Sequence, residues 1–366
     1  MTQVRIAVVG AGLIGRTHIA VLKSHHPDFT LAGVADPSPV AAEEGRALGY
    51  PVYPSMQALI ASESPDGVLI ATPNQTHVPL GLEAIARGLP ILVEKPLADS
   101  VASAARLVVA GRRAGIAIQT AHHRRHNPVL RRAAEILKEG SIGRLVAVTA
   151  CYLSHKPAGY HDLAWRREPG GGPVLINAIH DIDCLRMLAG EIESVQAFAS
   201  NAVRGFAVED TAAAALRFSN GALGTLVCSD TASSPWSWEW GSRENPKFPF
   251  DAEDCYTFSG TLGSLSVPTL VHRWHEPGRQ SWETPLTSRR HHVPLADAYV
   301  EQLRNFAAVI RGNEVPAVSG EDGLRTLATT LAISRSAATR APVDVSATVA
   351  TALAEADATA AGEDVS

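Results

Sequence analysis

A glycine-rich turn near the N-terminus has the spacing of a phosphate-binding loop. Gly10, Gly12 and Gly15 form the pattern Gly-x-Gly-x-x-Gly between an apolar run, Val4–Val9, and a segment with helical spacing. The first glycine permits a tight turn, the second lets the backbone approach a pyrophosphate, and the third brings helix and strand close together. The helix N-terminus adds unpaired N–H groups and a positive dipole end. The turn therefore predicts a bound dinucleotide.

An acidic residue follows the next apolar run at the place where a ribose would lie. Asp36 directly follows the apolar segment Leu31–Ala35. A carboxylate there accepts hydrogen bonds from ribose hydroxyls and repels a 2′-phosphate, which predicts NAD rather than NADP. The alternative is that Asp36 is only a turn residue within Asp-Pro-Ser.

A lysine with chemical potential lies in Glu94-Lys95-Pro96, directly after the apolar run Ile91–Val93. Ligands of parallel sheets bind at the carboxyl ends of the strands. A lysine there can donate a hydrogen bond to a substrate hydroxyl and stabilise a developing alkoxide. Taken alone, a lysine in such a position is more often a solvated surface residue.

The elements that must position these residues alternate between strand and helix up to residue 121. Short apolar runs predict strands, and segments with helical periodicity separate them. The further strands are expected at 67–71, 91–93 and 116–120, and the helices at 39–48, 77–87 and 101–114. The fold class is therefore α/β, with residues 1–121 forming a doubly wound parallel (Rossmann) sheet that binds NAD.

The pattern changes after residue 121. Helices are expected at 128–139, 174–188, 296–311 and 321–335, and strands at 145–152, 194–199, 211–218 and 222–228. Clear alternation in these strands predicts an α+β domain over 122–345 with a mostly antiparallel sheet. Residues 346–366 are rich in Ala and Thr, which predicts a frayed helix or a disordered tail.

The composition excludes several classes of binding partner. The formal net charge is −5, which provides no basic field for nucleic acid or anionic lipid. No stretch reaches the roughly 18 apolar residues of a membrane helix, and no secretory leader is visible. The four cysteines are far apart and form no zinc or disulfide pattern. We therefore expect a cytoplasmic protein with a small-molecule substrate.

A set of motifs along the chain resembles the glucose–fructose oxidoreductase / inositol dehydrogenase (Gfo/Idh/MocA) family. They are Ala71-Thr-Pro-Asn74, Glu94-Lys-Pro96, Gly170-Gly-Gly172, His180-Asp-Ile-Asp183, Glu209-Asp-Thr211, Asn220-Gly-Ala-Leu-Gly224, Gly260-Thr-Leu-Gly-Ser264 and Ser319-Gly-Glu-Asp-Gly323. The resemblance runs from about Arg5 to Val345. It implies a Rossmann domain followed by a domain whose large open sheet commonly mediates oligomerisation, and hence a homo-oligomer, a dimer or tetramer.

The resemblance also implies a reaction and two catalytic residues. Family members mostly oxidise or reduce secondary alcohols on sugars, inositols and related cyclic compounds. By position, Lys95 would orient and polarise the hydroxyl, and His180 would transfer its proton. Histidine suits this role because its ordinary pKa is near neutral. The alternative for His180 is a paired surface residue beside two aspartates.

The sequence departs from the family four residues before the histidine. Many members have an aspartate there, whereas this chain has Ile176, which can neither orient a lysine nor exchange a proton. Asn177 and Asp183 are each three residues from His180 and would share its helical face. We expect Asn177 to supply the missing polar contact and Asp183 to orient the histidine or bind substrate. The alternatives are that Asp181 holds the histidine, or that the site catalyses an unusual reaction. Asp183 is equally explained as a structural cap or ion pair.

Further residues are expected along the cofactor and substrate. The cofactor contacts are Gly10, Gly12, Leu13, Ile14, Gly15, Asp36, Thr72, Pro73, Asn74, His77, Glu94, Lys95, Trp165 and Arg166. The substrate contacts are His123, Lys95, Asn177, His180 and Asp183. Asn74 and His77 could instead cap a helix, and Trp165 could be a buried structural residue. The cluster 122–126 lacks cysteine or paired carboxylates at ligand spacing, so no metal is expected.

The segment Ser234–Phe250 contains three of the six tryptophans. It could form a substrate wall or an oligomer contact, and the second is slightly favoured. The resulting hypothesis is an NAD-dependent dehydrogenase acting on a CH–OH group of a sugar, inositol or cyclic polyol. The alternatives are an enzyme that retains NAD for elimination or glycosidic cleavage, a dihydrodiol dehydrogenase, and a non-catalytic NAD- or sugar-sensing protein.

Overall fold

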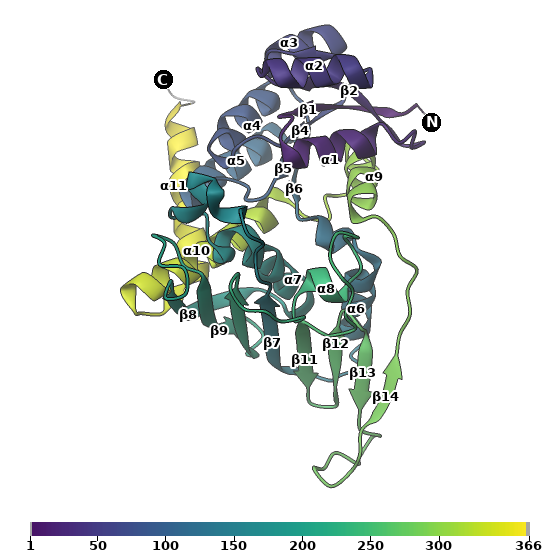
Figure 1. The fold of residues 1–366 in the computed structure, drawn as a ribbon, viewed down its shortest axis with the longest axis vertical. Coiled ribbons are helices and arrows are strands. Elements are labelled where there is room, and N and C mark those ends of the chain that lie inside the picture. Colours follow the sequence, from purple (N-terminus) through teal and green to yellow (C-terminus); the bar gives the residue numbers. More distant parts are fainter. Residues whose placement is uncertain (1, 364–366) are drawn as a thin grey trace. The chain divides into compact units, whose positions relative to one another are not determined.

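The computed structural model describes residues 2–363 and divides into two compact units (Figure 1). The first unit contains the chain up to His126, the segment Ala298–Leu327 and the C-terminal part from Val349. The second contains Asn127–Asp297 and Ala328–Thr348. The sequence predicts two contiguous domains, whereas in the structure the chain returns twice to the first unit.

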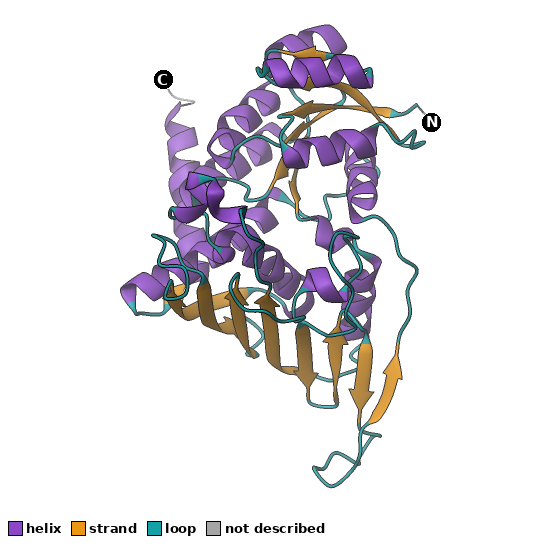
Figure 2. Ribbon diagram, viewed as in Figure 1, coloured by secondary structure: helices purple, strands orange, loops and turns teal. Residues whose placement is uncertain are grey.

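The first unit is built on a six-stranded sheet whose strand pairs are all parallel (Figure 2). Its order is β3-β2-β1-β4-β5-β6. The strands are β1 Val4–Val9, β2 Phe29–Ala35, β3 Val52–Tyr53, β4 Gly67–Ile70, β5 Ile91–Glu94 and β6 Ile118–Ala121. This is the order of a dinucleotide-binding Rossmann sheet, in which all strands end at one edge. The predicted α/β class is confirmed.

The helices of this sheet largely follow the predicted ranges. They are α1 Leu13–Leu22, α2 Pro39–Leu48, α3 Met56–Glu63, α4 His77–Ala86, α5 Val101–Ala114 and α9 Ala298–Ile310. The sequence analysis did not predict α3 or β3. Helix α3 is short and is capped by the preceding Ser55, whose side chain accepts a hydrogen bond from the N–H of Ala58.

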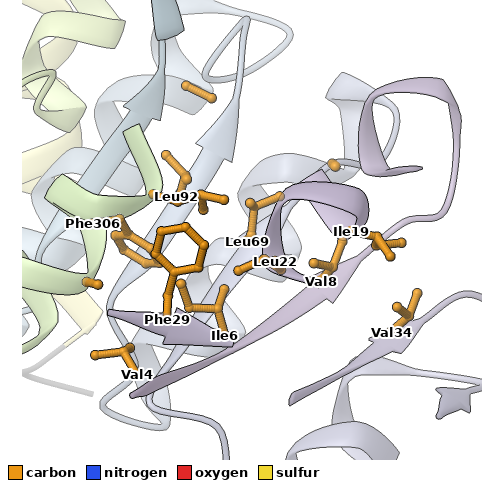
Figure 3. Packing of buried hydrophobic residues seen from close by; sticks show 14 of the residues in the cluster. Val4, Ile6, Val8, Ile19, Leu22, Phe29, Val34, Leu69, Leu92 and Phe306 are labelled. Carbon is orange, nitrogen blue, oxygen red and sulfur yellow. The ribbon is translucent and has the colours of Figure 1, made fainter. Parts of the chain in front are cut away.

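The core of the first unit contains side chains from strands and from the returning helix α9. Ile6, Leu69 and Leu92 are fully buried there together with Phe306 of α9 (Figure 3). Phe306 lies far beyond Leu92 in the sequence, and Leu303 and Ala307 of the same helix join it in the cluster. The hydrophobic core therefore requires a helix that follows most of the second unit in the sequence.

The second unit contains a nine-stranded sheet in the order β14-β13-β12-β11-β7-β10-β9-β8-β15. The strands are β7 Leu145–Leu153, β8 Ile192–Ser200, β9 Thr211–Phe218, β10 Leu223–Ser229, β11 Tyr256–Gly260, β12 Gly263–Val267, β13 Val271–Trp274, β14 Thr287–Arg290 and β15 Val343–Asp344. Only β7 and β10 are parallel among these pairs. The predicted mostly antiparallel sheet is confirmed. Buried and exposed residues alternate along β9, as expected for a sheet packed on one face.

The helices of the second unit lie along one side of this sheet in Figure 1. They include α6 Pro128–Lys138, α7 Ile179–Ala189 and the short α8 Trp238–Gly241. The helix predicted at 174–188 begins instead as a π-helical turn, Val174–Ala178, before α7.

Two long helices close the chain. Helix α10 covers Gly320–Thr339 and α11 covers Val345–Glu363. The end of the chain was expected to be a frayed helix or disordered tail, and the structure gives a helix through Glu363 with Val349, Ala352 and Ala356 buried. Residues 364–366 of that predicted tail lie outside the described residues.

Candidate active site

The glycine turn joins β1 to α1, and its glycines meet different surroundings. Gly10 has a φ of +98°, and a Cβ there would lie 2.7 Å from the carbonyl oxygen of Ala71. A Cβ on Gly15 would overlap the carbonyl oxygen of Gly10, whereas one on Gly12 would meet nothing within 4 Å. The protein's own packing therefore requires Gly10 and Gly15. Only Gly12 is explained by something outside the chain, such as a pyrophosphate.

The start of α1 is suited to phosphate. Gly12 is its N-cap, and no side chain caps the helix. The first backbone N–H groups are therefore available to an anion at the positive end of the helix dipole. Leu13 is 81% exposed beside this turn, and Ile14 is half-buried. The residues present fit an NAD pyrophosphate.

Asp36 ties the end of β2 to the glycine turn. One carboxylate oxygen accepts a hydrogen bond from the N–H of Ala11 at 2.7 Å, and the other accepts one from the N–H of Ser38 at 2.9 Å. The second bond is the Asp-Pro-Ser turn considered as the alternative. Both interpretations of Asp36 therefore have a structural basis, because each carboxylate oxygen keeps a further lone pair for a ribose hydroxyl.

The loop after β4 is held by a buried histidine. The two ring nitrogens of His77 each lie 2.9 Å from a backbone carbonyl oxygen, that of Thr72 and that of Pro96. His77 therefore joins the loop after β4 to the loop that carries Lys95. Thr72 and Asn74 are half-buried and Pro73 is exposed on the same loop. The proposed capping role of Asn74 is not formed, since neither its turn nor α4 has a side-chain cap.

A buried hydrogen bond between a histidine and a carboxylate lies directly before Lys95. The carboxylate of Glu94 lies 2.7 Å from Nε2 of His18, and both side chains are buried. Its other oxygen accepts a hydrogen bond from the backbone N–H of Lys95 at 3.1 Å. Burial acts to raise the pKa of Glu94, but His18, with the charges of Lys95 and His123, holds that pKa below its ordinary value. Glu94 thus holds the Lys95 turn in place through its hydrogen bonds to His18 and to the Lys95 backbone.

His123 contacts a residue that the sequence analysis did not identify. Its ring stacks on Tyr299 with centroids 4.5 Å apart. Tyr299 is in α9 and also meets the ring of His18 edge-on at 5.5 Å. Tyr299 thus connects His123 to His18, which contacts Glu94 next to Lys95. No motif marks Tyr299, because its role depends on where α9 packs.

The second unit positions the other predicted residues on one segment that ends in α7. A Cβ on Gly171 would lie 2.7 Å from Cα of Arg166, and one on Gly172 would lie 2.6 Å from the carboxyl carbon of Glu209. The same Glu209 accepts a hydrogen bond from the N–H of Val174 at 3.2 Å. Burial raises the pKa of Glu209. The glycines therefore allow the close packing that fixes the start of this helical segment.

Asn177 and His180 lie on opposite sides of a change in helix type. Asn177 is in the π-helical turn, and His180 is the second residue of α7. A π-turn is wider than an α-turn, so the three-residue spacing used to place them on one face does not apply. The side-chain oxygen of Asn177 is buried and has no hydrogen-bond partner within the described residues. Such an oxygen can accept a hydrogen bond from a ligand hydroxyl.

The two aspartates after His180 are buried structural groups. Asp183 lies 3.9 Å from Arg186, which also pairs with Glu191 at 2.7 Å. Asp181 accepts a hydrogen bond from the hydroxyl of Tyr256 at 2.5 Å. The contact with Arg186 therefore agrees with the ion-pair interpretation of Asp183, and its contact with His180 or substrate stays a prediction.

Trp165 and Arg166 lie in a short 3-10 turn, Ala164–Arg167. Trp165 is 51% exposed, so the buried structural alternative is wrong. The guanidinium of Arg166 lies 3.9 Å from the ring centre of Tyr160 and donates a hydrogen bond to the Tyr160 carbonyl at 2.6 Å.

The tryptophans of 234–250 have different surroundings. Trp238 is 1% exposed, donates a hydrogen bond to Glu244 at 2.7 Å, and stacks on Tyr256. Trp238 is therefore a core residue and takes neither role predicted for the segment. Both roles stay predictions for the exposed residues of the segment. Trp236, in contrast, is 47% exposed.

Residues 2–363 contain neither a candidate metal site nor a candidate membrane-spanning helix. No group of three or more His, Cys, Asp or Glu side chains in this range could hold a metal ion. No helix in the same part of the chain is long and apolar enough to cross a membrane.

Family comparisons match both units. Residues 4–122 match the family model described as "Oxidoreductase family, NAD-binding Rossmann fold", and residues 130–282 match the GFO/IDH/MocA C-terminal domain. The chain is 31% identical to 1,5-anhydro-D-fructose reductase of Ensifer adhaerens over 78% of this chain and 81% of the relative. It is 29% identical to inositol 2-dehydrogenase 2 of Saccharopolyspora erythraea over 93% and 95% of the two chains.

A solved structure agrees with these matches. The WlbA dehydrogenase of Bordetella pertussis, in complex with NADH and UDP-GlcNAcA, has a TM-score of 0.75 and 25% identity, covering 94% of this chain and 99% of that chain. The six-stranded sheet with its glycine turn is an NAD-binding domain, and the protein is an enzyme of the oxidoreductase class. The chain belongs to the Gfo/Idh/MocA family of oxidoreductases.

Proposed function

We propose that this enzyme transfers hydride between a secondary alcohol of a sugar, inositol or related cyclic polyol and NAD. The observation that carries the proposal is the position of Lys95. It follows β5 at the carboxyl edge of the NAD-binding sheet, on a turn joined by His77 to the neighbouring loop and by Glu94 to α1. Such support fixes a lysine for chemistry at the cofactor.

Each residue has a separate task in this proposal. The ammonium of Lys95 donates a hydrogen bond to the reacting oxygen and stabilises negative charge on it. His180 accepts the hydroxyl proton during oxidation and returns it during reduction. Asn177 offers its unpartnered oxygen to a neighbouring hydroxyl. Bound NAD supplies the hydride acceptor or donor.

The remaining predicted contacts take supporting positions. Gly12, Leu13, Ile14 and Asp36 would hold the pyrophosphate and ribose, and Thr72, Pro73 and Asn74 would line the cofactor. We assign His77 and Glu94 to positioning, because their polar atoms bind the protein itself. His123, stacked on Tyr299, would contact substrate.

The experiment is NADH formation by the full-length enzyme across sugars, inositols and cyclic diols, followed by variants on any active substrate. We expect Lys95→Ala and His180→Ala each to lower kcat by about 10²–10⁴-fold while NADH still binds, because each removes a group acting on the reacting hydroxyl. The matched control is Lys138→Ala, at an exposed lysine of α6, which should leave kcat unchanged.

Retained turnover in His180→Ala would refute the proton-transfer role. Product formation without NADH accumulation would replace the proposal with internal redox chemistry, in which NAD is oxidised and reduced within one cycle. Loss of NADH binding in Lys95→Ala would assign Lys95 to the cofactor rather than to the alcohol.

A further inference from the structure

The second unit contains a cluster of cationic and aromatic side chains that take no part in the proposed proton transfer. Tyr152 lies one residue before the end of β7, and Lys156 follows in the next loop. The ammonium of Lys156 donates a hydrogen bond to the Tyr152 hydroxyl at 3.1 Å and lies 4.8 Å from the ring centre of Tyr160. The guanidinium of Arg166 lies 3.9 Å from the same ring centre. Two cations therefore share one aromatic ring.

Backbone hydrogen bonds fix this cluster in place. The N–H of Ser154 donates to the carbonyl of Ser229 at 3.1 Å, and that of Lys156 donates to the carbonyl of Asp230 at 2.9 Å. These bonds continue the β7–β10 pairing into the loop. Arg166 is held by the Tyr160 carbonyl and by its close packing against Gly171. The same segment continues into the π-turn and α7, which carry Asn177 and His180.

The acidic groups nearby leave these two cations without an ion pair. Asp230 accepts a hydrogen bond from Arg204 at 3.1 Å and lies 3.3 Å from Nε2 of His161. Neither Lys156 nor Arg166 has a carboxylate partner within ion-pair distance in the described part of the chain. Nε of Arg166 is buried and has no hydrogen-bond partner there.

Burial makes the unpaired charge costly. The pKa of Lys156 is lowered, chiefly because burial disfavours the ammonium, although Glu239 and Asp230 act in the opposite direction. Burial also lowers the pKa of His161, which reduces its share of the positive charge near neutral pH. A partly desolvated cation gains most from a ligand that carries negative charge.

We propose that Lys156 and Arg166, with the Tyr160 ring, form a subsite for an anionic group on the substrate, a carboxylate or a phosphate. The substrate class would then be an acidic derivative of a sugar or cyclic polyol. This inference rests on the proposed function for the alcohol that reacts, but the charge preference is separate from turnover. A neutral sugar would leave both cations without a counter-charge.

The test is equilibrium binding to the NADH-loaded, full-length enzyme by calorimetry. The probes are D-glucose, D-glucuronate and D-glucose 6-phosphate, which share a ring and differ in charge. We expect at least one acidic probe to bind about tenfold more tightly than D-glucose, because a hydrogen bond to a charged group outweighs a neutral one. The two acidic probes distinguish a carboxylate site from a phosphate site.

Variants connect this preference to the cluster. Lys156→Met should remove the preference for the acidic probe, Lys156→Arg should retain most of it, and Lys138→Met, at an exposed lysine of α6, should leave it unchanged. Arg166→Gln should lower the affinity for the acidic probe more than the affinity for NADH. Thermal unfolding checks that each variant is folded.

Three results would overturn the subsite. They are acidic probes that bind no better than D-glucose or not at all, an acid preference that persists in Lys156→Met, and an Arg166→Gln variant that loses NADH affinity instead. None of these depends on NADH formation, so failure of the subsite is distinct from failure of the proposed dehydrogenase activity.

Discussion

Gly12 and Gly15 belong to one turn but are glycines for different reasons. Gly15 allows the backbone of α1 to approach the carbonyl of Gly10, which is a requirement of folding. Gly12 has open space where its side chain would be, and its φ of −68° suits any residue. Only the approach of a cofactor explains glycine there. Gly15 is therefore required for the stability of the fold, and Gly12 for the binding of the cofactor.

Substitution of each glycine by alanine tests this distinction. Gly15→Ala should lower the free energy of unfolding by roughly 2 kcal/mol or more, because its methyl group overlaps backbone. Gly12→Ala should unfold at the wild-type temperature but bind NADH at least about tenfold more weakly, since its methyl group occupies the phosphate's place. Thermal unfolding and NADH fluorescence titration measure the two effects. Equal NADH affinity in Gly12→Ala and wild type would contradict the assignment.

At the scale of elements, the start of α7 depends on a buried carboxyl group. Glu209 accepts the N–H of Val174, at the first residue of the π-turn. Burial raises the pKa of Glu209, so the folded protein binds a proton on this carboxyl group more tightly than the unfolded chain does. This proton binding adds to the free energy of unfolding at pH values below the ordinary carboxyl pKa. The contribution is lost as the pH rises through the raised pKa.

Glu209→Gln removes the ionisation while keeping an oxygen for Val174. We expect the variant to match wild type near pH 4.5 and to gain up to about 1 kcal/mol, or roughly 2–4 °C in Tm, by pH 7.5. Thermal unfolding across this pH range checks the trend. Glu193→Gln, at an exposed position of β8, should show no such trend. A Tm difference that is constant with pH would rule out the explanation.

At the scale of the whole molecule, the nine-stranded sheet has a face that exposes large apolar side chains. Phe198 of β8 and Leu223 of β10 are 74% and 56% exposed. The register of β8, β9 and β10 places both on the same side of the sheet, opposite the buried side chains of these strands. Apolar side chains gathered on one sheet face are typical of an interface between subunits. We propose that this face joins two copies of the chain.

Phe198→Glu tests this interface because it places a charge at the more exposed of these positions. We expect the variant to be a monomer by light scattering coupled to gel filtration, whereas wild type is a dimer or tetramer. Val315→Glu is the control, since Val315 is 81% exposed in the first unit and should not affect assembly. A monomeric wild-type protein, or an unchanged assembly in Phe198→Glu, would disprove the interface.

Much of the first unit could be predicted because its signals are local. The glycine turn, Asp36 and Lys95 each follow a short apolar strand, and parallel strands end at a common edge. The second unit was less predictable. Strands β11 to β14 were not expected, and the helix before His180 was expected to be regular from residue 174. A π-turn leaves no mark in hydrophobic spacing, so the sequence could not reveal it.

The sequence alone determined the class of cofactor and the residue types that face it, since a glycine turn and a carboxylate at strand ends have one common use. Only the tertiary structure decided which of these residues act on ligands and which support them. Glu94 and His77 bind the protein itself, and Asp183 pairs with Arg186. Tyr299 meets His123, and Lys156 and Arg166 share the ring of Tyr160. Such contacts join residues by packing rather than by spacing, and packing is set by the whole chain.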